Sequence, residues 1–228
     1  MTDETIYFPL PDRGSVTAIR SLPEGREPDC LFVYAPGAGS NVHDPFGSRL
    51  SRDLAARGLA CVRFQFPYME SRRSRSDPPG ILEDTWRKAL ETLGPSTGRL
   101  AVGGRSMGGR IASQVVAQGT KVDALALFAY PLHPPGRGDQ MRDTHLPAIG
   151  VPTLFCSGTR DAFGTPDELR AASAKVPGSG LHLLEGADHG FATLKSSGMT
   201  GEDVWEEAIS VLVEWLDGLP GSGSASAS

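Results

Sequence analysis

The chain has 228 residues, of which 39% are hydrophobic and 21% are charged, the composition of a folded globular protein rather than of a disordered or fibrous one. Its 22 Lys and Arg against 27 Asp and Glu give a formal net charge of −5, which disfavours nucleic acid or anionic lipid as a partner. The chain begins with acidic and polar residues unlike a secretory signal, and no apolar run is long enough to span a membrane, so we expect a cytoplasmic protein.

The first elements in chain order are a strand-like stretch at 15–22 and a turn-rich segment at 23–28, which predict one or two antiparallel strands at a sheet edge. From residue 31 onward, short apolar runs alternate with segments whose apolar residues recur every three or four positions. The apolar runs predict buried strands at 31–35, 59–66, 100–102, 124–130, 152–156 and 181–184. The periodic segments predict helices at 45–57, 81–93, 107–118, 166–175 and 204–216.

This alternation predicts an α/β fold with a doubly wound, mostly parallel sheet flanked by helices. We expect one domain over residues 1–219 and a flexible Gly/Ser/Ala tail over 220–228. Cys30, Cys61 and Cys156 lie beside or within apolar runs, which predicts buried free thiols and no disulfide framework. In such a fold, functional residues are expected in loops that follow the strands.

A Gly-x-Ser-x-Gly motif lies between a predicted strand and the next predicted helix. Its central residue is Ser106, with Gly104 and Gly108 two positions to either side. A serine raised above a sheet on so sharp a turn has a strained backbone, and the turn leaves no space for side chains at the flanking positions. We therefore predict Ser106 as a nucleophile and the N–H of Met107 as an oxyanion donor. A glycine turn without chemistry and a phosphate cradle are the alternatives, although neither Gly-x-Gly-x-x-Gly nor a P-loop sequence is present.

A nucleophilic serine requires a histidine base and an orienting carboxylate. Asp161 follows the strand predicted at 152–156, and His189 follows the last predicted strand, in the chain order that α/β-hydrolases use. We expect Asp161 to hold the Nδ1–H of His189 and Nε2 to take the Ser106 proton.

The remaining candidates for base and acid receive structural interpretations. We expect His43 to anchor a loop and His133 to lie near the pocket. We expect His145 to be solvated and His182 to pack on the surface of the sheet. Asp188 is adjacent to His189 in the chain and reaches poorly toward the Nδ1 of that neighbour. Asp167 is expected in the first turn of a helix, where it complements the helix dipole.

The loop at 35–41 follows the first buried strand, where hydrolases place the second oxyanion donor. Pro36 has no N–H, so we predict Ala38 as this donor and Gly37 as the second choice. A tight turn without chemistry is the alternative interpretation of this loop.

Four segments together resemble a known group of proteins: GGRSMGGR at 103–110, YPLHPPG at 130–136, GTRD at 158–161 followed by Phe163-Gly164, and GADH at 186–189. They resemble the α/β-hydrolases related to testis-expressed protein 30 and to subunit 3 of the non-specific-lethal acetyltransferase complex, and more distantly the dienelactone hydrolases. The resemblance extends from about residue 31 to about residue 216. It implies an α/β-hydrolase fold without cofactor or metal, in which Ser106, Asp161 and His189 form a triad.

Two residues depart from the patterns of these groups. The oxyanion loop has Pro36-Gly37 where related hydrolases often have His-Gly. Dienelactone hydrolases use a cysteine nucleophile where this chain has Ser106, so their substrate is not carried over.

The segment between 130 and 152 has room for a loop and one short helix around 140–145, too little for a large cap domain. We therefore expect an open, shallow pocket, which favours small acyl substrates over long lipids. Candidates for its apolar walls, with core packing as the alternative interpretation, are Tyr68, Met69, His133, Phe163 and Phe191.

One basic cluster, Arg72, Arg73 and Arg75, follows the strand predicted at 59–66. At the carboxyl end of a strand it is a candidate for binding an anionic substrate group, and a solvated surface loop is the alternative.

The sequence thus predicts a serine hydrolase that cleaves small carboxylic esters through an acyl-enzyme. A carboxylesterase is expected, and thioesters or amides are not distinguished because all three use the same machinery. The alternative is a non-catalytic scaffold of the same fold that binds a protein partner. A pure scaffold has no need of a strained nucleophile turn, which favours the enzyme.

Overall fold

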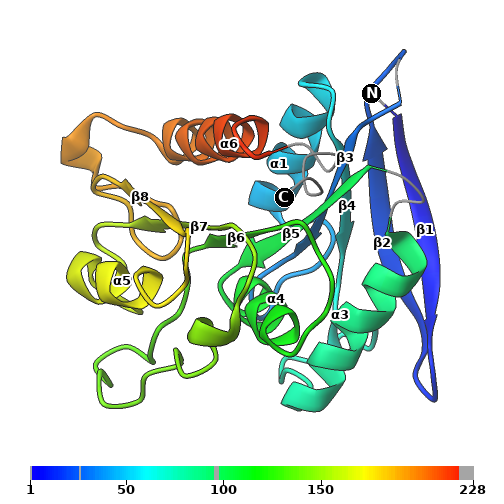
Figure 1. The fold of residues 1–228 in the computed structure, drawn as a ribbon, viewed down its shortest axis with the longest axis horizontal. Helices are drawn as coiled ribbons and strands as arrows, with labels where there is room; N and C mark the ends of the chain where they lie inside the picture. Colours follow the sequence, from blue (N-terminus) through cyan, green and yellow to red (C-terminus); the bar gives the residue numbers. More distant parts are fainter. Residues whose placement is uncertain (1, 26, 95–97, 221–228) are drawn as a thin grey trace, which may run out of the picture.

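A computed structural model of the chain describes residues 2–25, 27–94 and 98–220, and in this part of the chain eight strands form one sheet. Their order across the sheet is β1-β2-β4-β3-β5-β6-β7-β8 (Figure 1). Strands β3 to β8 run parallel, whereas β1 and β2 form an antiparallel hairpin at one edge. The strands are β1 (Thr2–Leu10), β2 (Gly14–Leu22), β3 (Cys30–Ala35), β4 (Ala60–Phe64), β5 (Arg99–Arg105), β6 (Ala124–Phe128), β7 (Thr153–Gly158) and β8 (Gly180–Leu184).

Helices cover both faces of this sheet, so the predicted doubly wound, mostly parallel α/β architecture is confirmed. Figure 1 shows α1 and α6 on one face and α3, α4 and α5 on the other. The helices are α1 (Pro45–Ala56), α2 (Pro67–Glu70), α3 (Pro79–Leu93), α4 (Met107–Ala117), α5 (Pro166–Ser173) and α6 (Gly201–Asp217). None of the helices in the described ranges is both long and apolar enough to cross a membrane.

Two features differ from the sequence-based expectations, and a third expectation cannot be compared. The polar stretch at 2–10 is a full strand, because it pairs along its whole length with β2 at an exposed edge, where apolar side chains are not required. The short helix expected around 140–145 is absent, and only a single 3₁₀ turn, Leu146–Ala148, follows that segment. Residues 221–228 of the predicted tail lie outside the described residues.

The strands at the centre of the sheet are buried on both faces and divide their side chains between two apolar layers. In β3, Val33 belongs to the layer under α3 and α4, whereas Phe32 and Tyr34 belong to the layer under α1 and α6. Successive strand residues point to opposite faces, so one continuous apolar run serves both layers. The three cysteines are buried and free, as predicted, and burial raises the pKa of the Cys61 thiol to about 12.

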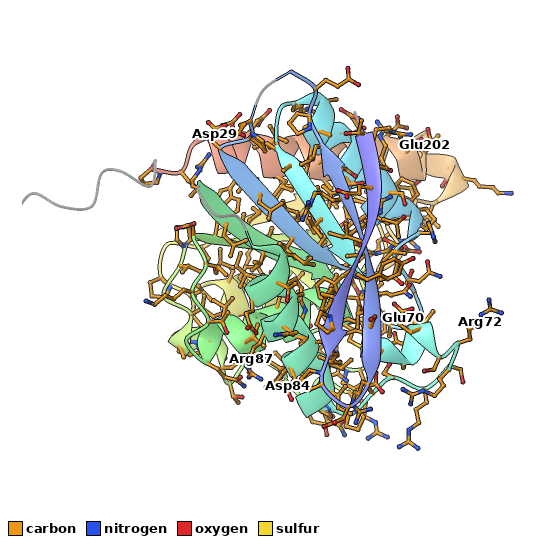
Figure 2. The ribbon with its side chains drawn as sticks, turned by 90° about the vertical axis from the view of Figure 1, so that its right-hand side faces the viewer. Asp29, Glu70, Arg72, Asp84, Arg87 and Glu202 are labelled. Carbon is orange, nitrogen blue, oxygen red and sulfur yellow. The ribbon has the colours of Figure 1, made fainter. Side chains whose placement is uncertain are left out.

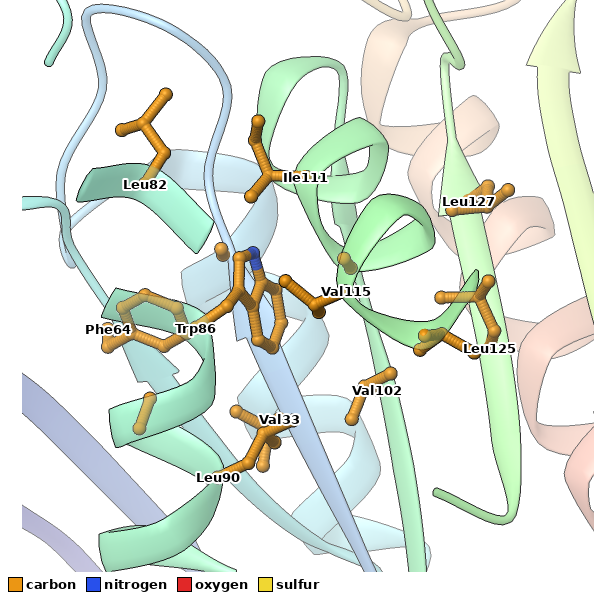
Figure 3. Close-up of a cluster of buried hydrophobic side chains, with 14 of the residues drawn as sticks. Val33, Phe64, Leu82, Trp86, Leu90, Val102, Ile111, Val115, Leu125 and Leu127 are labelled. Carbon is orange, nitrogen blue, oxygen red and sulfur yellow. The ribbon is translucent and has the colours of Figure 1, made fainter. Parts of the chain in front are cut away.

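Trp86 of α3 is the largest fully buried side chain in the layer under α3 and α4 (Figure 3). Its ring meets Phe64 edge-to-face, with 4.8 Å between centroids, and packs beside Val115 of α4. Its Nε1–H donates to the carbonyl oxygen of Gly108, 3.2 Å away, which ties α3 to the first turn of α4. Trp86 therefore links the core to the segment that follows Ser106.

The sheet order also fixes where a site can form. From β3 the chain passes to β4 on one side, and β5, the other neighbour of β3, is followed by β6 further out on that other side. Connections that diverge from two adjacent parallel strands leave a crevice at their carboxyl ends. The residues that follow β3 and β5 are the loop that contains Gly37 and the turn that contains Ser106.

We expect Trp86→Ala to lower the free energy of unfolding by about 3–5 kcal/mol, because it removes a fully buried ring and leaves a cavity. Urea denaturation followed by circular dichroism measures the loss. Glu91→Ala, an exposed change on the same helix, is the control and should stay within about 0.5 kcal/mol of wild type. A loss below about 1 kcal/mol for Trp86→Ala would contradict this account of the core.

Candidate active site

Ser106 occupies a strained turn between β5 and α4. Its backbone has φ 51° and ψ −117°, a conformation that is costly for any residue other than glycine. The Ser106 N–H donates to the carbonyl oxygen of Phe128 on β6 at 2.8 Å, which holds the turn against the sheet. The strain therefore persists because neighbouring strands fix both sides of the turn.

The glycines on either side of Ser106 allow the surrounding backbones to approach closely. A Cβ atom on either Gly104 or Gly108 would overlap the carbonyl oxygen of Ala35 at the end of β3. At Gly108 it would also lie 2.6 Å from the carbonyl oxygen of Pro36. The sequence-based expectation that no side chain fits at these two positions is confirmed.

The structure brings Ser106, Asp161 and His189 together in one hydrogen-bonded line. His189 Nε2 lies 2.8 Å from Ser106 Oγ, and His189 Nδ1 lies 2.8 Å from Asp161 Oδ2. The Asp161 side chain is only 1% exposed, and its other oxygen, Oδ1, accepts the N–H of Phe163 at 2.8 Å. A buried carboxylate facing Nδ1 keeps the proton on that nitrogen, so Nε2 presents its lone pair to the serine hydroxyl.

Two further contacts orient the imidazole. The Phe163 ring stacks on the His189 ring with centroids 4.0 Å apart and an interplanar angle of 29°. Arg105 Nη2 donates to the carbonyl oxygen of His189 at 3.2 Å, and its guanidinium lies 5.3 Å from the centre of the Phe191 ring. The loop after β8 is thus fixed to the end of β5.

Two residues that line the pocket beside Ser106 have backbone N–H groups for which the described part of the chain provides no acceptor. Met107 is the first residue of α4, so its N–H has no acceptor within the helix. Within the described part of the chain, the N–H of Ala38 donates to no acceptor either. A turn closed by the hydrogen bond from Ser40 N to Gly37 O, at 3.2 Å, presents Ala38. Both predicted oxyanion donors therefore line the same pocket as Ser106.

This pocket has a volume of about 450 Å³. Of the residues that the sequence singled out, Gly37, Ala38, Met107 and Phe163 line it together with Ser106 and His189. The lining residues not expected from the sequence are Ser40, Asp44, Arg105, Arg110, Pro131 and Arg142.

Four of the five predicted wall residues lie elsewhere. Met69 borders a separate groove, and the rings of the other three are taken up by packing or hydrogen bonds. Tyr68 is fully buried beneath the loop after β3, where its hydroxyl accepts the N–H of Gly39 at 2.9 Å. Phe191 is fully buried against Phe46, with 5.3 Å between ring centroids. His133 is buried and bonded through Nε2 to Glu168 of α5 at 3.1 Å.

The basic cluster does not line this pocket. Arg72 and Arg73 border a separate groove with Met69 and Glu70, and Figure 2 shows the Arg72 side chain pointing away from the body of the molecule. Arg73 pairs with the buried carboxylate of Asp77, with 2.6 Å between Nη2 and Oδ1. The candidate role in binding substrate beside Ser106 is therefore not supported, and the cluster lies in an exposed loop, as its alternative interpretation expects.

His145, expected to be solvated, is instead bonded inside the protein. Its Nε2 lies 2.8 Å from Ser113 Oγ and 3.3 Å from the Tyr130 hydroxyl, both of them buried. Burial, with a smaller contribution from the positive charge of Arg110, lowers the pKa of His145. A polar stretch of sequence gave no sign of this, because both partners are distant in the chain.

Among the described residues, no group of three or more His, Cys, Asp or Glu side chains is placed to hold a metal ion. Asp44, a carboxylic acid that lines the pocket, has a structural role. Its carboxylate accepts hydrogen bonds from the Tyr34 hydroxyl at 2.9 Å, from Ser40 Oγ at 3.2 Å and from the N–H of Gly47 at 2.8 Å. The third of these bonds caps α1.

A sequence model of the family described as alpha/beta hydrolase domain matches residues 28–217. The chain belongs to the alpha/beta hydrolase family. The matched range begins just before β3 and ends with α6, so it contains the whole pocket.

Solved alpha/beta hydrolase structures superpose on nearly the whole chain. Est1E from Butyrivibrio proteoclasticus has a TM-score of 0.72 at 12% identity, covering 93% of this chain and 99% of its own. XC6422 from Xanthomonas campestris, described as a serine hydrolase without a lid, has a TM-score of 0.74 at 18% identity, covering 96% of this chain and 98% of its own. A dienelactone hydrolase from Anabaena variabilis has a TM-score of 0.72 at 19% identity, covering 95% of this chain and 97% of its own. At these identities the likeness concerns the fold.

We expect Gly108→Ala to destabilise the protein by about 1–3 kcal/mol and to abolish most activity, because the new methyl group would push α4 away from β3. Gly80→Ala near the start of α3 is the matched control, since a Cβ there meets nothing within 4 Å. That change should be neutral or stabilising by up to about 1 kcal/mol. Thermal unfolding measures the stability of both variants, and a hydrolase assay measures their activity. A wild-type result for Gly108→Ala would contradict the close approach.

The lowered pKa of His145 predicts a specific pH dependence of stability. The folded state binds this proton less readily than the unfolded state, so the stability that His145 contributes is fully present above its unfolded pKa of about 6.5 and is lost as the pH falls. Between pH 7.5 and pH 5, wild type should therefore lose more free energy of unfolding than His145→Gln.

Urea titrations at several pH values test this expectation, with exposed His43→Gln as the control that keeps the wild-type slope. The charged groups that act on His145 are Arg110, Asp143 and Glu83, and all remain in both proteins. The pKa of His133 is raised by its bond to the Pro134 carbonyl and then by Glu168. Because His133 is present in both proteins, its contribution cancels in the difference between their stability curves. Parallel curves for wild type and His145→Gln would refute the assignment.

Proposed function

We propose that this alpha/beta hydrolase is a serine esterase that cleaves small carboxylic esters through an acyl-enzyme intermediate. The observation that carries the proposal is the line from Asp161 through His189 to Ser106, with 2.8 Å at each step, ending in an open pocket. Family membership supports a hydrolase, and esterases are among the proteins of similar fold.

Acylation begins when Ser106 Oγ attacks the ester carbonyl carbon and its proton passes to His189 Nε2. Asp161 stabilises the imidazolium, and the N–H groups of Met107 and Ala38 donate to the oxyanion of the tetrahedral intermediate. The bond from carbon to the leaving oxygen then breaks. The proton on Nε2 moves to that oxygen, which leaves an alcohol and an ester on Ser106.

Deacylation repeats these steps with water. A water molecule gives a proton to His189 Nε2 as its oxygen attacks the acyl carbon, and the same two N–H groups hold the second oxyanion. Collapse of this intermediate breaks the bond to Ser106 Oγ and returns the proton from Nε2 to the serine. The products are a carboxylic acid and the free enzyme.

The pocket favours small substrates. A volume of about 450 Å³ bordered by the ring of Phe163 is within the range of small-molecule sites and gives no tunnel for a long acyl chain. We also propose, from the four shared segments, that within the family the chain is related to testis-expressed protein 30 and to the acetyltransferase-complex subunit. A scaffold that binds a protein partner, rather than a small ester, is the competing outcome of the test below.

The test is labelling with a fluorophosphonate probe together with hydrolysis of 4-nitrophenyl esters of increasing acyl length. Wild type should be labelled and should turn over the short esters fastest. Ser106→Ala should lose labelling entirely, and both it and His189→Ala should lose about 10⁴- to 10⁶-fold in kcat.

His43→Ala is the matched control, because this exposed histidine lies outside the pocket and should keep wild-type rates. A folded wild type that is neither labelled nor active would overturn the proposed esterase and favour the scaffold.

A further inference from the structure

The catalytic pocket contains two arginines that have no carboxylate partner. Arg110 lies one helical turn after Ser106 on α4, and Arg142 comes from the loop between β6 and β7. Within residues 2–25, 27–94 and 98–220, neither guanidinium has an ion pair within 4.0 Å. Among the described residues, the side chain of Arg110 makes a single hydrogen bond, a long contact of 3.4 Å to Gln114 on the same helix.

The other charged groups of the pocket do not neutralise this pair. Arg105 is used to hold the His189 loop, and all three hydrogen bonds to the Asp44 carboxylate come from groups around the start of α1. Arg110 and Arg142 line the same pocket. Burial and then the positive charge of Arg142 lower the pKa of Arg110, against smaller raising contributions from Tyr130 and Glu83. Two partly buried like charges without a partner favour an anion between them.

The backbones of the two arginines are fixed by one buried polar cluster, formed by Ser113, Tyr130 and His145. Ser113 Oγ donates to the carbonyl oxygen of Arg110 at 2.7 Å, and the Tyr130 hydroxyl donates to that of Arg142 at 3.0 Å. His145 Nε2 contacts both hydroxyls. Since both hydroxyl protons are used on carbonyls, the Nε2 of His145 carries the proton that bridges them. The Ser113–Tyr130–His145 cluster therefore pre-organises the two arginines beside the nucleophile.

We propose that Arg110 and Arg142 bind an anionic group of the substrate, and that the preferred substrates are esters that carry a carboxylate a short distance from the scissile carbonyl. This inference rests on the proposed esterase activity and names its substrate class. Arg110 follows Ser106 by four positions along α4, a rise of about 6 Å, which a short dicarboxylic chain can span. The planar fork of an arginine matches a carboxylate with two parallel hydrogen bonds.

The test compares esters of matched shape that differ in charge. On the acyl side, the 4-nitrophenyl monoester of glutaric acid is compared with 4-nitrophenyl valerate. On the alcohol side, 4-acetoxybenzoate is compared with its methyl ester. Wild type should prefer the charged member of at least one pair by about tenfold to a hundredfold in kcat/KM, and added salt should reduce this preference.

Arg110→Gln and Arg142→Gln should each remove most of that preference, because the loss in kcat/KM falls mainly on the charged member of each pair. Arg137→Gln, an exposed arginine in the same loop as Arg142 but outside the pocket, is the matched control and should keep it. Circular dichroism checks that each variant is folded, and Arg142→Gln, which alters a loop, carries the test if the helix variant does not fold. Equal rates for charged and neutral esters, or a preference that survives in both variants, would overturn the inference.

A binding measurement separates this inference from the proposed function. Glutarate should raise the unfolding temperature of Ser106→Ala, and it should not do so when Arg142→Gln is added. If neutral and charged esters are hydrolysed at equal rates, the proposed esterase activity is supported and the anion site is refuted. If no ester is hydrolysed but glutarate still stabilises Ser106→Ala through Arg142, the anion site is supported and the proposed esterase activity is refuted.

Discussion

The close contact of three backbones, at the end of β3, at the end of β5 and in the first turn of α4, is the constraint on which the pocket depends. Gly104 and Gly108 permit it, since a side chain at either position would overlap the carbonyl oxygen of Ala35. The contact places the loop with Gly37 and Ala38 beside Ser106 and holds Ser106 at φ 51°. Ser106 and the backbone N–H groups proposed as oxyanion donors are therefore parts of one packing arrangement rather than separate additions to the fold.

The architecture could be predicted because its signals are local. Apolar runs such as that of β3 are long enough to show burial on both faces, and the Gly-x-Ser-x-Gly motif requires its own backbone geometry. The positions of Asp161 and His189 followed from chain order, since both lie just after strands and the carboxyl ends of parallel strands meet at one edge. The strand β1 was less clear, because an exposed edge strand needs no apolar pattern.

The rest of the pocket depends on contacts between residues far apart in the chain. An aromatic residue near a strand end can face a cavity or fill the core, and composition does not distinguish the two; Tyr68 and Phe191 fill the interior, whereas Phe163 reaches the site. The charged side chains give a similar example. The run with Arg72 and Arg73 is conspicuous in the sequence but points elsewhere, whereas Arg110 and Arg142 are isolated in sequence and meet only in the folded chain.

The strained conformation of Ser106 has a consequence for folding as well. Nothing within α4 itself requires φ 51°; the conformation is imposed by the hydrogen bond to β6 and by the contact with β3. A partly folded chain that lacks either strand relaxes this turn, and the serine hydroxyl then loses its place beside His189. The proposed reactive centre consequently requires a sheet that is assembled from β3 to β6, because only then is Ser106 held beside His189.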